Sequence, residues 1–109
     1  MTQYKPDRFV LLRIELTDSV EFKVLAGWSG GYLVSDSWKI NSGIESYYID
    51  DNGYYHFIGY SGSEYKVHPD QYGISMAFGH ILSTALDHPN VSLVTLEFFE
   101  EETNAYKIR

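Results

Sequence analysis

The sequence predicts an α+β fold: a mostly antiparallel β-meander sheet with one helix packed on one face and a final C-terminal strand. Two observations predict it. Turn-forming residues recur about every eight to twelve residues through the first two-thirds of the chain, as in antiparallel meanders. After His68 the hydrophobic pattern changes from the two-residue period of a strand to the longer period of a helix. The 109 residues contain no linker or internal repeat, so we expect a single domain, 1–109.

The first two strands are predicted as a hairpin. Residues 9–17 alternate, with one apolar face formed by Val10, Leu12, Ile14 and Leu16. Asp18-Ser19 is the predicted tight turn, and residues 20–26 form the second strand.

A glycine-rich segment, residues 27–31, then interrupts the pattern. A third strand is predicted from Tyr32 to Ile40, with Val34, Trp38 and Ile40 on one face. Asp36 falls on this apolar face. Either a β-bulge shifts the register there, or the carboxylate lies beside Trp38 and needs a hydrogen-bond partner.

Asn52-Gly53 is the strongest local signal, because this dipeptide is preferred in two-residue type I′ turns. Such a turn places Tyr48 opposite Phe57, and a second turn at Ser61-Gly62 extends the unit to three strands. The predicted core face carries Tyr47, Ile49, His56, Ile58, Tyr65 and Val67. The opposite face carries Tyr48, Asp50, Tyr55, Phe57, Lys66 and His68.

A helix is predicted from Ser75 to Asp87. Its spacing buries Phe78, Ile81 and Ala85 and leaves His80 and Thr84 outside. Pro89 ends it. Residues 91–99 then read as the final strand, followed by an acidic tail, Glu100 to Glu102.

Composition excludes several classes of function. The formal net charge is −7, and residues 41–109 carry the excess, with ten acidic and three basic residues. Nucleic-acid binding needs a basic surface, so we expect no direct nucleic-acid binding and instead a partner with a basic or mixed surface. No apolar run spans a bilayer and residues 1–8 are polar, so we expect a cytoplasmic protein without membrane contact.

The sequence offers no convincing catalytic or metal-binding motif. Cysteine is absent, and the four histidines include no pair at helical spacing. Gly59 to Ser63 only partly matches a nucleophile elbow, and the Ser-x-x-Lys match of Ser63 to Lys66 lies on a predicted strand, where the two side chains point to opposite faces. We expect no catalytic residue, metal site or cofactor.

Three stretches resemble a group of small phage and prophage proteins of no known activity. They are Gly27 to Tyr32, Asp36 to Ile44, and Tyr55 to Phe57 with Gly59 and Ser61 to Ser63, within roughly residues 24–75. The resemblance implies a mobile genetic element, in which small acidic proteins disable host defences by binding a protein or a signalling nucleotide. It assigns no catalytic residue.

Three hypotheses of function follow. The first is a non-enzymatic, phage-derived protein that occupies a surface of a host defence protein through the face of Tyr48, Asp50, Tyr55, Phe57, Lys66 and His68. The competing interpretation is that this sheet is covered on both faces, by the chain itself or by a second subunit in a homo-oligomer. The second is a binder of small molecules or nucleotides, whose aromatic pocket in segment 27–43 is formed by Trp28, Tyr32, Asp36, Trp38 and Asn41. The third is a small enzyme.

Overall fold

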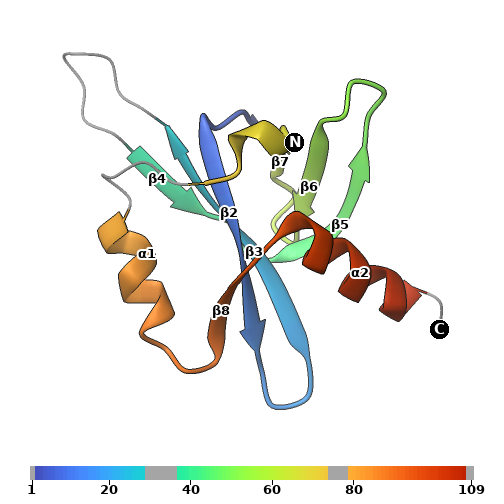
Figure 1. Ribbon diagram of the computed structural model, residues 1–109. Coiled ribbons are helices and arrows are strands. Elements are labelled where there is room, and N and C mark those ends of the chain that lie inside the picture. Colours follow the sequence, from blue (N-terminus) through green and yellow to red (C-terminus); the bar gives the residue numbers. More distant parts are fainter. Residues whose placement is uncertain (1, 29–36, 74–78, 108–109) are drawn as a thin grey trace.

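The computed structural model describes residues 2–28, 37–73 and 79–107. Within them the chain forms two four-stranded sheets and two α-helices (Figure 1). The strands are β1 (Gln3–Tyr4), β2 (Arg8–Glu15), β3 (Val20–Trp28), β4 (Ser37–Ile40), β5 (Ile44–Ile49), β6 (Tyr55–Gly59), β7 (Glu64–Val67) and β8 (Val91–Val94). The helices are α1 (Gly79–Leu86), α2 (Leu96–Lys107) and a short 3₁₀ turn, η1 (Pro69–Gln71). The α+β class with mostly antiparallel strands is confirmed, but the meander divides into two sheets.

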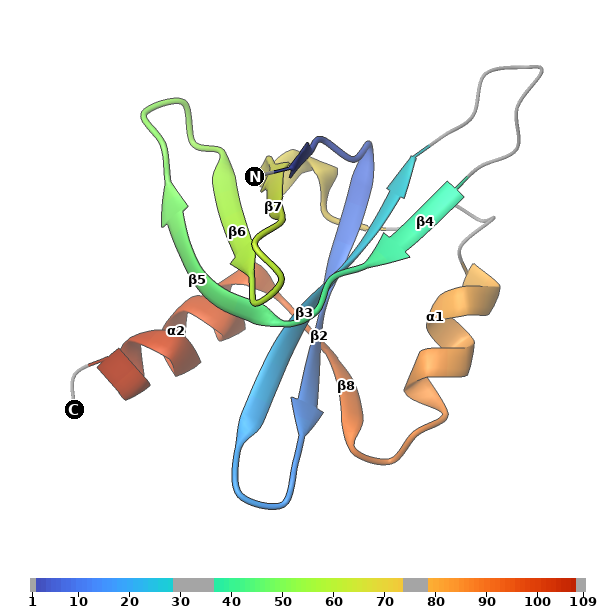
Figure 2. The same cartoon turned by 180° about the vertical axis from the view of Figure 1, so that it is seen from behind.

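The sheet β4-β3-β2-β8 is the middle layer of the molecule. One of its faces packs on α1, and the other packs on the sheet β1-β7-β6-β5 and on α2 (Figures 1 and 2). Both faces of the β2-β3 hairpin are therefore buried. Phe9 and Leu11 belong to the core between the sheets, whereas Val10 and Leu12 contact the α1 side.

The predicted first hairpin is confirmed with a different turn. Glu15 pairs with Val20, and the Leu16 amide donates to the Ser19 carbonyl at 2.8 Å, so the tight turn is centred on Thr17 and Asp18. Leu16, predicted on the core face, is exposed at the tip. Of the predicted third strand, the described part is β4, which pairs with the end of β3. Residues 32–36 lie outside the described residues.

The three-stranded unit β5-β6-β7 exists, but its predicted register is wrong by one residue at both turns. Tyr48 pairs with His56 and Tyr47 with Phe57, because the loop from Asp51 to Gly53 has three residues. The Gly53 amide donates to the Asp50 carbonyl at 3.0 Å, and only Gly53, at φ +84°, has the left-handed conformation that a type I′ turn requires of both residues. The second loop, ending at Gly62 with φ +91°, has the same design.

A one-residue slip exchanges the two faces of a strand. The two slips cancel across the unit, so the predicted faces of β5 and β7 are right and β6 alone is inverted. Ile49, predicted in the core, is nevertheless 47% exposed at the end of β5. Tyr55 and Phe57 point into the core between the sheets, where they are 8% and 0% exposed. His56 and Ile58, predicted in the core, lie on the opposite face of the sheet.

Helix α1 begins at Gly79 in the described residues and follows the predicted faces. Leu82 is buried, Ile81 and Ala85 pack beside it on Val10, Leu12 and Leu25, and His80 and Thr84 are exposed. Phe78 and the predicted start at Ser75 lie outside the described residues.

The predicted final strand ends early, and a second helix replaces the rest of it and the acidic tail. β8 stops at Val94, and Thr95 caps α2, because its Oγ1 accepts the Phe98 amide at 3.1 Å. Phe99 lies in the main core against Phe22 and Phe57. Arg13 Nε is 3.1 Å from both Glu102 carboxylate oxygens and ties α2 to β2. Helix α2 thus closes the open end between the two sheets.

Candidate functional site

The predicted partner face does not exist as one surface. Tyr55 and Phe57 are buried on the inner side because β6 is inverted, so neither can contact a partner. Tyr48 and Lys66 remain outside, with Asp50 and His68 at the loop end of the same sheet. The observed register therefore removes two predicted contact residues from the outer face and places His56 there.

His56 is held between two carboxylates on this outer face. Its Nε2 lies 2.8 Å from Asp50 Oδ2, and its Nδ1 lies 3.0 Å from Glu64 Oε2. Glu64 also accepts a hydrogen bond from the Gln3 side chain on β1. His56 and Glu64 are only 6% and 8% exposed although they face away from the main core. We call Asp50, His56 and Glu64 the carboxylate–histidine array.

Two carboxylates on one ring favour the imidazolium, because only the protonated ring can donate from both nitrogens. Burial alone opposes this charge, but the hydrogen bonds to Asp50 and Glu64 outweigh it and raise the pKa of His56. The same contact with His56 is the main cause that lowers the pKa of Asp50 and of Glu64. The array is therefore a fixed set of charges with a net charge of −1 when all three groups are ionised.

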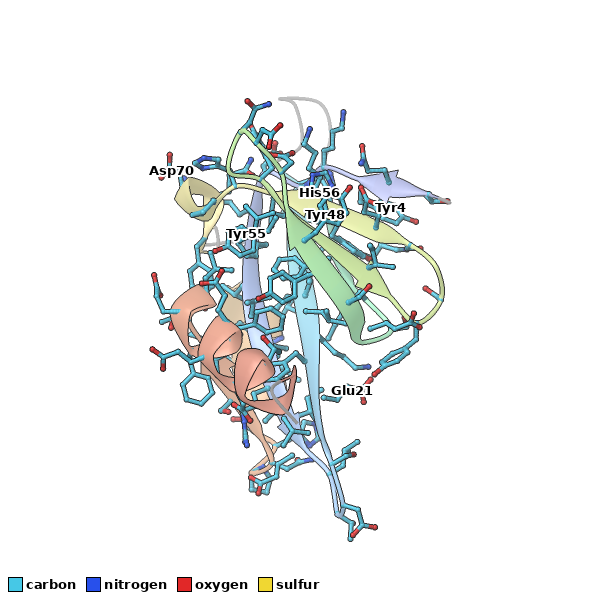
Figure 3. The ribbon with its side chains drawn as sticks, turned by 90° about the vertical axis from the view of Figure 1, so that its right-hand side faces the viewer. Tyr4, Glu21, Tyr48, Tyr55, His56 and Asp70 are labelled. Atoms are coloured by element: carbon cyan, nitrogen blue, oxygen red, sulfur yellow. The ribbon has the colours of Figure 1, made fainter. Side chains whose placement is uncertain are left out.

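Tyr48 covers this array. Its ring stacks on the His56 ring at a centroid distance of 4.3 Å and an interplanar angle of 5° (Figure 3). The other side of Tyr48 faces solvent, and the residue is 50% exposed. Lys66 lies beside the array with its Nζ 4.8 Å from the centre of the Tyr54 ring, and Tyr54 in turn contacts His68. An aromatic ring in a defined orientation is thus surrounded by both signs of charge.

The alternative aromatic pocket is not one site in the described residues. Trp28 and Trp38 point to opposite faces of their sheet, because Trp38 pairs with Gly27, the neighbour of Trp28. Trp28 packs on Tyr4 at the main core, whereas Trp38 lies in a groove beside α1. Tyr32 and Asp36, the other predicted members, lie outside the described residues.

Asn41 has a structural position instead. Its side-chain Oδ1 accepts a hydrogen bond from the Val24 backbone amide at 2.9 Å, and its backbone amide donates to the Val24 carbonyl at 3.0 Å. Its side-chain Nδ2 is buried and has no hydrogen-bond partner among the described residues. Asn41 thus continues the pairing of β3 beyond the end of β4.

Both ring nitrogens of His56 are engaged by carboxylates within the array. Each nitrogen of His56 already has a carboxylate partner, so neither is available to accept a proton from a hydroxyl nucleophile. Across residues 2–28, 37–73 and 79–107, no group of three or more His, Asp or Glu side chains is arranged to hold a metal ion.

The sequence analysis placed His56 in the core and did not name Glu64 as a site residue. A signal existed, since a histidine in a strand with acidic residues at the ends of both flanking loops can form such an array. It required the three-residue loops, which place Glu64 and Asp50 on the same face as His56.

No protein family model, curated protein or solved structure matches this chain. Neither helix within the described ranges combines the length and the apolar character that crossing a membrane requires.

Proposed function

We propose that this protein is a non-enzymatic binding protein that occupies a surface of another protein with a basic or mixed charge. The observation that carries the proposal is the stacking of a half-exposed Tyr48 on the buried His56 of the carboxylate–histidine array. Tyrosine provides much contact area at low entropic cost and is enriched at the centres of interfaces.

The array supports this role by fixing the Tyr48 ring before a partner arrives. A side chain that is already ordered loses less conformational entropy on binding. The carboxylates of Asp50 and Asp51 lie at the loop end of the same sheet, and Lys66 supplies a positive charge nearby. Such a rim suits a partner that presents basic groups around an apolar contact.

The resemblance to phage and prophage proteins gives this proposal its biological setting. In that setting the partner is a host defence protein in the bacterial cytoplasm, and the protein inhibits it by steric occupation. A second copy of the chain is the competing partner.

The test compares two exposed aromatic residues. Immobilised wild-type protein, Tyr48→Ala and the matched control Phe98→Ala are used to capture proteins from a bacterial lysate, and the affinity for the captured protein is then measured. Tyr48→Ala is expected to weaken binding by about 2 kcal/mol or more, the loss typical of a hot-spot residue. Phe98, 44% exposed on α2, is expected to be neutral.

Equal binding by both variants, or the absence of a captured protein, contradicts the proposal. Self-association that Tyr48→Ala abolishes would identify the partner as a second copy. Unfolding curves of both variants establish that each is folded.

A groove beside α1 favours a second candidate function, binding of a planar small molecule. It has a volume of about 410 Å³ and is lined by Trp38 and Ile40 of β4 and by His80, Ile81 and Thr84 of α1. Ligand sites are commonly apolar concavities of this size with a few polar groups. Thermal-shift measurements with nucleotides test it, because a ligand raises the melting temperature by mass action and Trp38→Ala should abolish the shift. An enzyme remains the third candidate.

A further inference from the structure

A second concave site lies where β3, β5 and α2 meet. The cavity has a volume of about 300 Å³, and its walls include Glu21, Glu45, Tyr47, Tyr60 and Phe99. Figure 3 shows Glu21 below the sheet that carries Tyr48 and His56. Aromatic rings and carboxylates therefore share one cavity.

The missing side chain of Gly43 leaves room for the Glu21 carboxylate in this cavity. A Cβ at Gly43 would lie 2.1 Å from Glu21 Oε1 and 2.9 Å from Cδ2 of the Tyr60 ring. Both groups thus pack on bare backbone, at a residue whose φ of +126° favours glycine. The Tyr60 amide donates to the Gly43 carbonyl at 3.1 Å, which fixes the loop that carries the ring.

The negative charge of the cavity is not balanced among the side chains that the structure describes, which on α2 end at Thr103. Neither Glu21 nor Glu45 has a hydrogen-bond or ion-pair partner there, and the lining residues include no lysine or arginine. Lys23, two residues along β3, does not line it. Glu21 is half-buried and Glu45 is exposed. A half-buried carboxylate without a partner is stabilised when a cation binds beside it.

We propose that this cavity binds the guanidinium group of an arginine side chain on a protein partner. The guanidinium is planar and weakly hydrated, so it stacks on tyrosine rings while it donates hydrogen bonds to carboxylates. Glu21 and Glu45 supply the charge complement, and Tyr47 and Tyr60 supply the ring faces. The inference goes beyond the proposed function, because the cavity includes neither Tyr48 nor the carboxylate–histidine array.

The experiment uses N-acetyl-arginine amide as the probe and its uncharged isostere, N-acetyl-citrulline amide, as the comparison. Backbone amide signals of the ¹⁵N-labelled protein are followed by NMR during each titration. The arginine probe is expected to shift the signals of Gly43, Ser46 and Thr103 in a saturable way, and citrulline to bind at least about fivefold more weakly. Lysine amide is expected to bind more weakly than arginine amide.

Two variants with the same change in net charge sharpen the test. Glu21→Gln is expected to weaken arginine binding by about fivefold, whereas the control Glu101→Gln, exposed on α2, leaves it unchanged. Equal binding of arginine and citrulline by the wild-type protein overturns the proposal even if Glu21→Gln fails to fold. Lysine binding as tight as arginine overturns the choice of guanidinium.

Other occupants give different results. Cavity signals that move with protein concentration alone would point to a second copy. Cavity signals that change in Arg109→Gln without a probe would point to a basic residue of this chain itself. Either outcome overturns the proposal that the arginine belongs to a different protein. Failure of Tyr48→Ala to affect partner capture would leave the arginine titration unaffected, so the two proposals fail separately.

Discussion

Phe57 and His56, on opposite faces of β6, are buried to a similar extent by different means. On the inner face Phe57 is fully buried among aromatic rings of β2, β5 and α2. On the outer face His56 is only 6% exposed, but carboxylates and the Tyr48 ring bury it. The inner face is stabilised mainly by apolar area and the outer face by paired charge, so a buried position in this sheet does not by itself identify the hydrophobic core.

Phe57→Ala should produce the largest effect, because it leaves a cavity in the aromatic core. We expect the free energy of unfolding to fall by about 3 to 5 kcal/mol in chemical denaturation. The control Ile58→Ala, on the outer face of the same strand, should cost about 1 kcal/mol, since Ile58 is only half-buried. Equal costs for both variants would mean that the inner face of β6 is not the core.

His56→Gln should have the next largest effect, because glutamine cannot supply the charge that Asp50 and Glu64 share. A loss of about 1 to 3 kcal/mol is expected in the same assay, as for a buried group that loses its hydrogen-bond partner. The control is His88→Gln, in an exposed turn. A loss no greater than that of His88→Gln would show that the array contributes no stability.

The stability that the array contributes should also depend on pH, and this dependence should be smaller than the whole loss in His56→Gln. The raised pKa of His56 means that its contribution is complete below its ordinary value of 6.5 and is lost as the pH rises through the folded value. The lowered pKa values of Asp50 and Glu64 mean that their contribution is complete above the ordinary values, 3.8 and 4.5, and is lost at lower pH. Denaturation across pH should therefore show the array at full strength between about pH 4.5 and 6.5. His56→Gln should flatten this profile, and an unchanged profile contradicts the assignment.

Substitutions in the loop before β6 should change the stability least. Gly53→Ala should cost about 1 kcal/mol, because alanine disfavours the left-handed conformation at φ +84°. Asn52→Ala should cost less, since Asn52 does not have a positive φ. A type I′ turn would instead make both substitutions costly. Comparable losses of stability in thermal unfolding would therefore support the two-residue turn and contradict the three-residue loop.

The hairpin of β2 and β3 and the described part of α1 were predicted because each has a clear period. The prediction failed at β6 because each face of Tyr-His-Phe-Ile carries two residues of moderate or high hydrophobicity. The pattern therefore does not show which face is the core, and only the turn could fix the register. Asn-Gly favours a two-residue turn, but Asp50 Oδ1 accepts the amides of Asn52 and Tyr54, at 2.9 and 3.1 Å, and stabilises the longer loop. Tertiary contacts also determine the structure after β8. The packing of Phe99 and the Glu102–Arg13 pair stabilise helix α2 where the pattern alone favoured a strand.

The position of Asn41 has a consequence for association between molecules. An open strand edge exposes amides and carbonyls on which another chain can assemble, the first step of aggregation through β-sheets. At Val24 both backbone groups on that edge are already bonded to Asn41, one through its side chain. An incoming strand would have to break two hydrogen bonds there before forming any of its own, so this amide side chain protects β3 against fibril-like growth where β4 has ended.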